Sequence, residues 1–206
     1  MDITKKQHYS PEEYLALDDA AENKNEYIMG KIIAMTGATT NHNRIARNLS
    51  AWLHFASKDG DEYENFIGDV KLWIPEEQAY TYPNVMVVAG AVEYHQNRTD
   101  IICNPRVIIE VLSQSTEYYD RLEKFSLYRT IPSLEEYVLI SQIRFHVEHD
   151  SKRAVKQWNL QDLDSEDIQL PLTSIPFTIP LEDLYRKVQF SEVDREANPE
   201  SALTDF

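Results

Sequence analysis

The stretch from Pro105 to Tyr128 constrains this chain most, because it places a charged residue inside an otherwise apolar strand. Val107 to Ile109 are three β-branched residues in succession, which predicts a strand buried on both faces. Glu110 follows directly, and a carboxylate in that position is costly to bury unless a partner compensates its charge. After a short polar turn, the sequence from Glu117 has the pattern of a helix.

The predicted helix, Glu117–Arg129, carries charged side chains back toward this strand. Asp120 and Lys124 are four residues apart and share one face. The apolar residues share another face: Tyr118, Leu122 and Phe125. A carboxylate at a strand end, followed by a helix that returns a lysine to it, predicts a hydrolytic site. Two alternatives stay open: Asp120 and Lys124 form an ordinary exposed ion pair, or Glu110 lies on an edge strand and faces water.

Length and composition fit one globular domain. The chain has 206 residues, 42% of them apolar and 11% aromatic, which is enough to build a sizeable core. We expect a single domain over residues 1–190 and an acidic, disordered tail over 191–206. A single cysteine, Cys103, fits a reducing compartment. Without an apolar signal segment or membrane span, a cytoplasmic location is expected.

The net charge of −15 restricts the possible partners. It argues against broad, nonspecific affinity for nucleic acid, which needs a basic surface. It leaves room for a localised basic groove, and we look for one at Lys71, Arg98, Arg121 and Lys124.

Apolar periodicity and turn residues predict the remaining elements. Two further helices are expected: Pro11–Asp18 capped by Ser10, and Asn43–Ser57 capped by Asn41 with Ile45, Leu49, Trp52 and Leu53 facing the core. Strands are expected in these stretches: a hairpin over Glu26–Met35 that turns at Gly30, then Tyr63–Ile67, Val70–Ile74, Tyr80–Val88, Glu135–Ile140, Arg144–Glu148 and Lys152–Leu160. A short helix is expected at Leu181–Tyr185. This order predicts an α/β (α+β) fold with a mixed central sheet flanked by helices.

Several of these residues together resemble the Uma-two family of restriction-endonuclease-like proteins, which is similar to the PD-(D/E)XK nuclease superfamily. The most specific match is EVLS-x-x-T-x-x-x-D-x-x-x-K, from Glu110 to Lys124. Other matching positions are Glu26 with Gly30, His42, Tyr82-Pro83-Asn84-Val85, Tyr128 and Glu136-Tyr137. The resemblance covers residues 10–184 and implies a restriction-endonuclease-like core, a DNA substrate and a homodimer.

The resemblance also implies a set of site residues. In the superfamily, carboxylates hold Mg²⁺ or Mn²⁺ beside the scissile phosphate, and a lysine stabilises the developing charge. Here Glu110 matches the second acid, and Lys124 on the helix replaces a lysine expected at Leu112. Asn84 occupies the position of the first acid, so the implied catalytic residues are Asn84, Glu110 and Lys124. Asn84 and Glu110 are the implied metal ligands, and the implied accessory residues are Glu26, His42 and Asp120.

Asn84 is the main departure from the family pattern, which has aspartate after Tyr-Pro. An amide offers a metal one carbonyl oxygen and no charge, so Mg²⁺ should be held weakly. Three explanations stay open: an inactive or repurposed relative, an engineered substitution, or recruitment of another acid such as Glu26 or Asp69. Besides a metal-dependent endonuclease, the sequence therefore allows an inactive nuclease-fold binding or regulatory module. It also allows an acidic protein-interaction domain with no nucleic-acid role.

Overall fold

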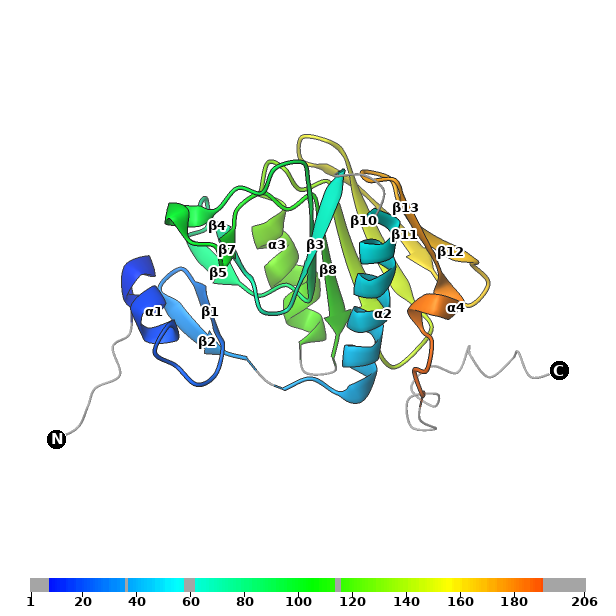
Figure 1. Ribbon diagram of the computed structural model, residues 1–206, viewed down its shortest axis with the longest axis horizontal. Helices are drawn as coiled ribbons and strands as arrows, with labels where there is room; N and C mark the ends of the chain where they lie inside the picture. The colour runs from blue at the N-terminus through cyan, green and yellow to red at the C-terminus, as the bar shows by residue number, and fades with distance from the viewer. Residues whose placement is uncertain (1–7, 36, 58–61, 114–115, 191–206) are drawn as a thin grey trace.

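The computed structural model describes residues 8–35, 37–57, 62–113 and 116–190 (Figure 1). The expected acidic tail, residues 191–206, and the first seven residues of the expected domain lie outside the described residues. The single-domain assignment over residues 1–190 therefore stays a prediction. Among the described helices, none combines the length and the apolar character needed to span a membrane.

A six-stranded sheet forms the centre of the fold, in the order β11-β10-β9-β8-β6-β3. Its strands are β3 (Tyr63–Ile67), β6 (Val85–Ala89), β8 (Val107–Leu112), β9 (Glu136–Ser141), β10 (Val147–Ala154) and β11 (Gln157–Leu163). Strand β8 pairs in parallel with β9 and antiparallel with β6. The predicted mixed central sheet is therefore confirmed, and all six residues of β8 are buried, as their apolar run indicates.

A five-stranded sheet in the order β2-β1-β5-β4-β7 lies beside the first (Figure 1). Its strands are β1 (Asn25–Ile28), β2 (Lys31–Ala34), β4 (Lys71–Ile74), β5 (Ala79–Thr81) and β7 (Ile101–Ile102). A 3₁₀ turn, η2 (His95–Asn97), precedes β7, and a separate hairpin pairs β12 (Gln169–Leu172) with β13 (Phe177–Pro180). Sequence periodicity missed that hairpin, because Pro171 and Pro180 interrupt its strand pattern.

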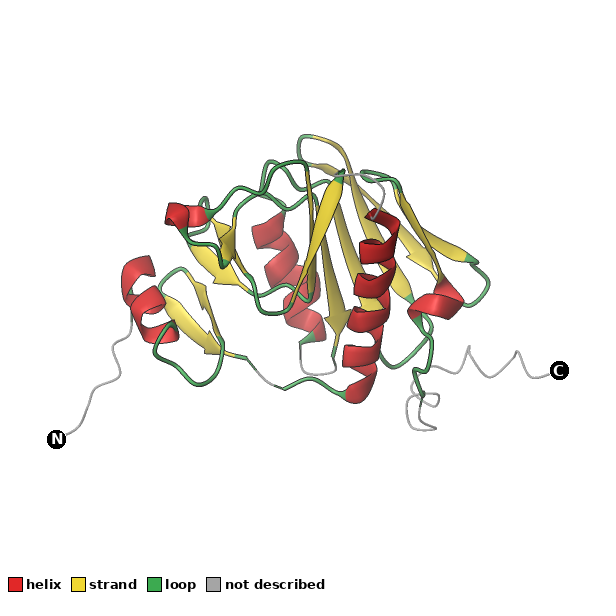
Figure 2. Ribbon diagram, in the orientation of Figure 1, coloured by secondary structure: helices red, strands yellow, loops and turns green. Residues whose placement is uncertain are grey.

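Helices flank the six-stranded sheet on both faces (Figures 1 and 2). They are α2 (Thr40–Ala56), the π-helical segment η3 (Tyr119–Lys124) continuing into α3 (Phe125–Tyr128), and α4 (Leu181–Leu184). Helix α1 (Pro11–Asp18) instead packs against β1 of the five-stranded sheet. Helix α2 packs on one face of β8 in a core that includes Leu49 and Ile109. Leu127 and Tyr128 pack on the other face with Ile108. The two faces of β8 thus belong to different cores.

The start of α2 differs from the prediction. The helix begins at Thr40, because the Thr39 hydroxyl accepts the His42 N–H at 3.2 Å and caps it. Asn41 is inside the helix, where its side-chain amide donates to the Gln189 carbonyl at 2.8 Å. Trp52 was expected in the core but is 39% exposed. By contrast, Ser10 and Glu13 cap α1 reciprocally, as predicted.

Strands β10 and β11 also differ from their predicted bounds. The predicted strand Lys152–Leu160 runs across the hairpin turn, where Lys156 has φ of 62°. Along β10, the residues that point inward are Val147, His149 and Ser151. Because two of these three residues are polar, the alternation of buried and exposed side chains along β10 does not appear as an alternation of apolar and polar residues.

Gly30 turns the β1–β2 hairpin with φ of +88°, a conformation that costs an L-residue about 1 kcal/mol or more. An added Cβ at Gly30 would also meet the His8 ring, which would have to shift. Gly30→Ala should therefore lower the free energy of unfolding by about 1–2 kcal/mol or more, measured by urea denaturation. Gly37→Ala is the matched control, because Gly37 lies outside the left-handed region and an added Cβ there meets nothing within 4 Å. Equal losses for the two variants would contradict the prediction.

Candidate active site

Glu110 is the centre of the candidate site. It lies on β8, between β6 and β9, and is 1% exposed. Its neighbours along the strand, Ile109 and Val111, face the α2 side, so Glu110 points to the face covered by residues 117–128. The alternative in which Glu110 lies on an edge strand and faces water is wrong. Burial in this position requires compensating partners.

Lys124 supplies the opposite charge from the facing helix. Its Nζ lies 3.0 Å from Glu110 Oε1, 3.2 Å from Glu26 Oε1 and 3.3 Å from Asp120 Oδ1. Asp120 and Lys124 are both buried, so the alternative of an exposed surface pair is also wrong.

The helix presents this charged face to the sheet and turns part of its apolar face outward. Tyr118 is 73% exposed and Leu122 is 54% exposed, although their spacing with Phe125 predicted a packed face. An exposed apolar side chain costs less than a buried carboxylate without a counter-charge. The π-helical geometry of Tyr119–Lys124, which is frequent at functional sites, carries both Asp120 and Lys124.

Glu26 reaches the site from the other sheet. It lies on β1 and is buried, where its Oε1 accepts the Tyr82 N–H at 3.1 Å. Its Oε2 accepts the Tyr119 hydroxyl at 3.0 Å. Glu26 is therefore a buried member of the site and not an exposed strand residue. Asp69, the other acid considered as a substitute, is instead exposed and paired with Lys24.

Asn84 lies beside Glu110, but its side chain has a structural contact. The Asn84 N–H donates to Glu110 Oε2 at 3.0 Å, and its Oδ1 accepts the Val111 N–H at 2.7 Å. The pairing of β6 with β8 begins at Val85 opposite Ile109. The Asn84 side chain thus satisfies a backbone donor just beyond the last paired residue. The predicted first-acid position is close to Glu110, with its oxygen directed at the backbone.

His42 lies in the first turn of α2, close enough to the site to be affected by its charges. Burial lowers the pKa of its imidazole, the Asp120 carboxylate opposes this, and the Lys124 ammonium adds to it. A backbone hydrogen bond with Val111 also opposes the lowering. His42 is half-buried, and the cap of α2 is Thr39.

Two tyrosines complete the site. The Tyr128 hydroxyl lies 3.0 Å from Glu110 Oε1 and 3.2 Å from the Thr81 hydroxyl. The ring of Tyr119 lies 5.4 Å from Lys124 Nζ. Sequence reasoning did not assign either tyrosine to the site. The four-residue spacing from Asp120 through Lys124 to Tyr128 could have indicated that Tyr128 shares their face.

The electrostatics of the centre are dominated by burial and mutual charge. Burial raises the pKa of Glu110 to about 7, opposed by the Lys124 ammonium and reinforced by Asp120 and Glu26. The three carboxylates hold the pKa of Lys124 well above its ordinary value although burial acts in the opposite direction. Lys124 is therefore a cation at neutral pH, and the site has more negative than positive charge.

The residues as arranged do not fit a divalent metal. Their chemistry is suitable, because hard cations prefer carboxylate oxygens. However, Glu26, Glu110 and Asp120 each direct an oxygen at Lys124 Nζ, and Asn84 Oδ1 is directed at the backbone. Within the described ranges, no group of three or more His, Cys, Asp or Glu side chains is placed to hold a metal ion.

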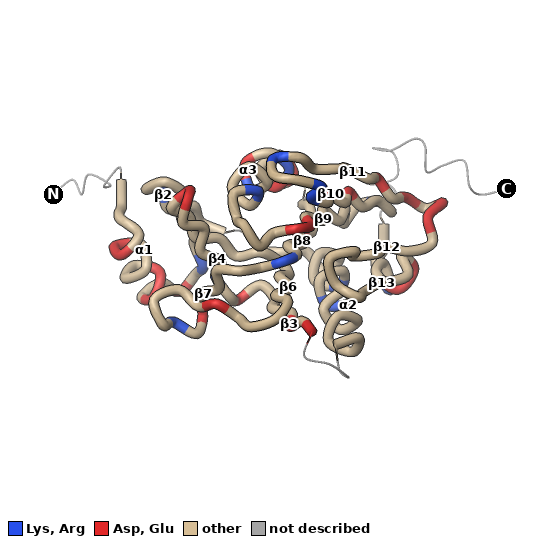
Figure 3. Tube along the Cα trace, turned by 90° about the horizontal axis from the view of Figure 1, so that it is seen from above, with Lys and Arg blue, Asp and Glu red and all other residues tan. Residues whose placement is uncertain are grey.

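The four basic residues considered for a nucleic-acid groove are all paired with acids. Lys71 contacts Asp18 at 3.1 Å, and Lys124 is held as described above. Arg98 and Arg121 are held by these carboxylates: Asp19 and Asp100, and Glu117 and Glu148. Basic positions are spread over several elements in Figure 3. These four residues therefore give no unbalanced positive patch.

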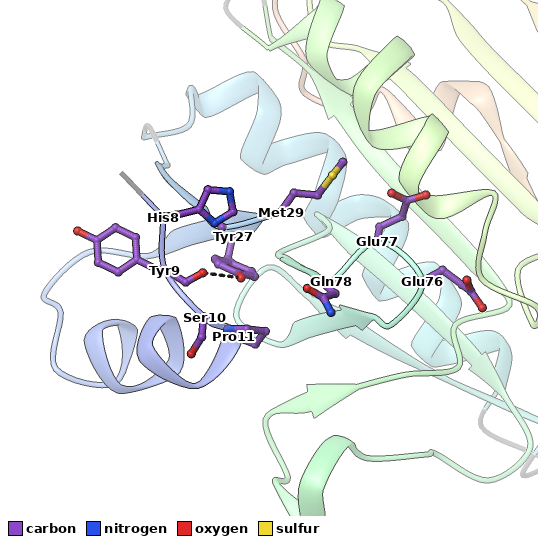
Figure 4. Close-up of a pocket in the computed structure, with 10 residues that line it drawn as sticks. His8, Tyr9, Ser10, Pro11, Tyr27, Met29, Glu76, Glu77 and Gln78 are labelled. Carbon is purple, nitrogen blue, oxygen red and sulfur yellow. Dashed lines mark hydrogen bonds between the residues drawn. The ribbon is translucent and has the colours of Figure 1, made fainter. Parts of the chain in front are cut away.

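An open groove of ≈ 560 Å³ lies elsewhere, near the start of the described chain (Figure 4). Its lining includes His8, Tyr27, Met29 and Glu77, and Tyr27 donates a hydrogen bond to the Tyr9 carbonyl at 2.9 Å. None of the predicted site residues lines it. The chemistry of the Glu110 centre is thus separate from this hollow.

Most of the chain is similar to known proteins in sequence, and its fold is similar to that of a solved structure. Residues 11–182 match the sequence model of the Uma2 (Uma-two) family, described as "Putative restriction endonuclease". The "Uncharacterized protein sll1609" of Synechocystis sp. (strain ATCC 27184 / PCC 6803 / Kazusa) is 43% identical over 158 residues, 77% of this chain and 89% of that protein. The "Uncharacterized protein slr1290" of the same organism is 35% identical over 181 residues, 88% of this chain and 93% of that protein.

A solved structure has the same fold. It is the "Crystal structure of a putative nuclease belonging to DUF820 from Anabaena variabilis ATCC 29413". The TM-score is 0.69 with 19% identity, over 88% of this chain and 99% of that chain. At that identity the match concerns the fold, and it agrees with the predicted nuclease-like architecture.

Glu110→Gln should change how stability depends on pH. Because burial raises the pKa of Glu110 from 4.5 to about 7, the folded protein between these values holds a proton that the unfolded chain releases. The free energy of unfolding should therefore fall as pH rises through that window. The variant cannot titrate at this position and should show a smaller fall, measured by urea denaturation in chelator at about pH 5 and about pH 7.5.

Glu123→Gln is the control for this measurement, because Glu123 is an exposed glutamate on the same helix. It should keep the pH dependence of the unaltered protein. Identical profiles for the Glu110 and Glu123 variants would show that Glu110 does not titrate in this window.

Proposed function

Because the chain belongs to the Uma2 family, we propose that it is a DNA endonuclease of the PD-(D/E)XK type, which hydrolyses phosphodiester bonds. The observation that carries the proposal is the pairing of Glu110 with Lys124 Nζ at 3.0 Å on the face of a central strand. A carboxylate and an ammonium in contact are the residue types that this chemistry needs.

Each proposed site residue has a distinct role. Glu110 is the acid that accepts a proton or holds a cation, and Lys124 stabilises negative charge at the reacting phosphate. Asn84 stands where the family has an acid and holds the strand end beside Glu110. Glu26, His42 and Asp120 are proposed as accessory residues. Mg²⁺ or Mn²⁺ is the proposed cofactor, with Asn84 and Glu110 as its proposed ligands. It would be held weakly and only after these side chains rearrange, because Asn84 is neutral and bonded to the backbone and Glu110 is paired with Lys124.

A second candidate is an inactive nuclease-fold module that binds or regulates a partner. The neutral Asn84 supports it, because its oxygen accepts the Val111 N–H at 2.7 Å and brings no charge to the site. A third candidate, an acidic interaction domain without a nucleic-acid role, is supported by the net charge of −15 and by the pairing of Lys71, Arg98 and Arg121 with acids. Activity measurements separate these candidates from the nuclease.

Asn84→Asp is the variant that tests the nuclease proposal. Aspartate keeps the volume and can still accept the Val111 N–H, while it adds an anion beside Glu110. In chelator, repulsion between the two carboxylates should lower the free energy of unfolding by about 1–2 kcal/mol. Mg²⁺ at about 100 times its Kd should then raise the free energy of unfolding of this variant by about 2.7 kcal/mol. DNA cleavage with Mg²⁺ or Mn²⁺ should rise from slow or undetectable to measurable.

Asn104→Asp is the matched control for thermal melts and cleavage assays. Asn104 also accepts a backbone N–H, from Glu93 at 2.8 Å, but it precedes the opposite end of β8. This change adds the same charge without creating a site, so metal should not stabilise it further. If Asn84→Asp responds to metal as the unaltered protein does, Asn84 is not at a metal site. If it binds metal and leaves DNA intact, the inactive module is the better assignment.

We also propose a homodimer. Strand β11 supports this, because it is an edge of the six-stranded sheet and is largely exposed on both faces, including Leu160. Such edges are protected from further pairing or used for it. Light scattering at micromolar concentration should give twice the chain mass, and Leu160→Lys should give the monomer mass. Ile168→Lys, an exposed loop position, should leave the dimer intact; a monomeric unaltered protein would refute the proposal.

A further inference from the structure

Lys124 has the coordination of a cation that is already fully bound. Its ammonium group has three N–H donors, and three carboxylate oxygens lie at 3.0, 3.2 and 3.3 Å, from Glu110, Glu26 and Asp120. The four side chains are all nearly inaccessible to solvent. The ammonium donates a hydrogen bond to Glu110 Oε1 at 3.0 Å, and it forms ion pairs with Glu26 and Asp120, so all of its printed partners are anionic.

Two of the three acids are also held by neutral donors. Glu110 accepts the Asn84 N–H and contacts the Tyr128 hydroxyl, while Glu26 accepts the Tyr82 N–H and the Tyr119 hydroxyl. These contacts orient the carboxylates toward a common point, and the ammonium stands at that point. The arrangement is that of a cation site whose cation is part of the chain.

We propose that the Lys124 ammonium is the resident cation of this site, so that a divalent metal binds there only by displacing it. Metal and ammonium then compete for the same three carboxylates, and the lysine-centred state is a metal-free, closed state of the site. The inference rests on the proposed function only for the location of the site, and its test needs no nucleic acid. A displaced ammonium could form a cation–π contact with the half-buried ring of Tyr119, whose centroid already lies 5.4 Å from Lys124 Nζ.

Competition between the ammonium and a metal predicts different metal affinities from those that net charge alone predicts. Three carboxylates and one ammonium leave a formal charge of −2. Lys124→Met removes the ammonium and leaves −3, so tighter metal binding by that variant has two explanations. The double variant Lys124→Met with Glu26→Gln returns the charge to −2 and has one metal ligand fewer. If the net charge alone sets the metal affinity, the double variant binds metal no more tightly than the unaltered protein. If the ammonium limits affinity by occupying the position between the carboxylates, the double variant binds metal more tightly.

The experiment measures Mn²⁺ binding by calorimetry, together with thermal melts in chelator and in Mn²⁺, for the unaltered protein and three variants. The expected Kd of the double variant is about tenfold lower than that of the unaltered protein, a middle value for coupled binding events. Lys124→Met should melt lower in chelator and gain more from Mn²⁺ than the unaltered protein. Glu26→Gln alone, which keeps the ammonium, should bind no more tightly than the unaltered protein. A double variant that binds Mn²⁺ equally or more weakly overturns the proposal.

A measurement on the unaltered chain decides the matter if the lysine variants do not fold. The side-chain ¹⁵N signal of a buried ammonium held by three carboxylates should be visible by NMR because its protons exchange slowly. Saturating Mg²⁺ should remove or shift the Lys124 signal, which is assigned in the unaltered protein through the bonded carbons of its side chain. Mg²⁺ that binds at Glu110 while this signal is unchanged overturns the proposal. Cleavage by Asn84→Asp tests the nuclease function separately, so failure of one proposal is distinguishable from failure of the other.

Discussion

The buried carboxylate of Glu110 is the constraint on which the rest of the structure depends. A charge at this depth in a sheet would destabilise the fold by several kcal/mol without a partner. The chain compensates it from three directions: the Asn84 backbone, the Tyr128 hydroxyl and the Lys124 ammonium. Lys124 in turn brings Asp120 with it, so the helix presents these two charged residues to the sheet together with Leu127 and Tyr128, while Tyr118 and Leu122 are exposed.

The same centre joins parts of the fold that are far apart in the sequence. Glu26 comes from the five-stranded sheet, Glu110 from the six-stranded sheet and Lys124 from the helix between them. Removing one member of such a buried set typically costs about 3–5 kcal/mol, because the remaining charges lose their partner. The relative position of the two sheets is therefore stabilised by the chemistry of the site as well as by apolar packing.

Much of this could be predicted from the sequence, and the failures have physical causes. The burial of β8, the start of α1 and the return of Lys124 toward Glu110 follow from local apolar runs, caps and helical spacing. The inward faces of His149 and Ser151 could not be predicted, because polar residues pack inward only where tertiary partners satisfy them; His149 Nε2 lies 2.5 Å from Glu136 Oε2. The contact of Asn84 Oδ1 with the Val111 N–H could not be predicted either, because it depends on the register between β6 and β8, which cannot be read from the sequence.

The double contact of Asn84 has an evolutionary consequence. Its backbone N–H and its side-chain oxygen make the two bonds that hold the strand end to β8, and an aspartate can make both with the same atoms. Exchange of acid for amide therefore alters the charge of the centre while the scaffold stays in place. A lineage with this architecture can lose or regain an anionic group by one conservative substitution, without passing through a misfolded intermediate.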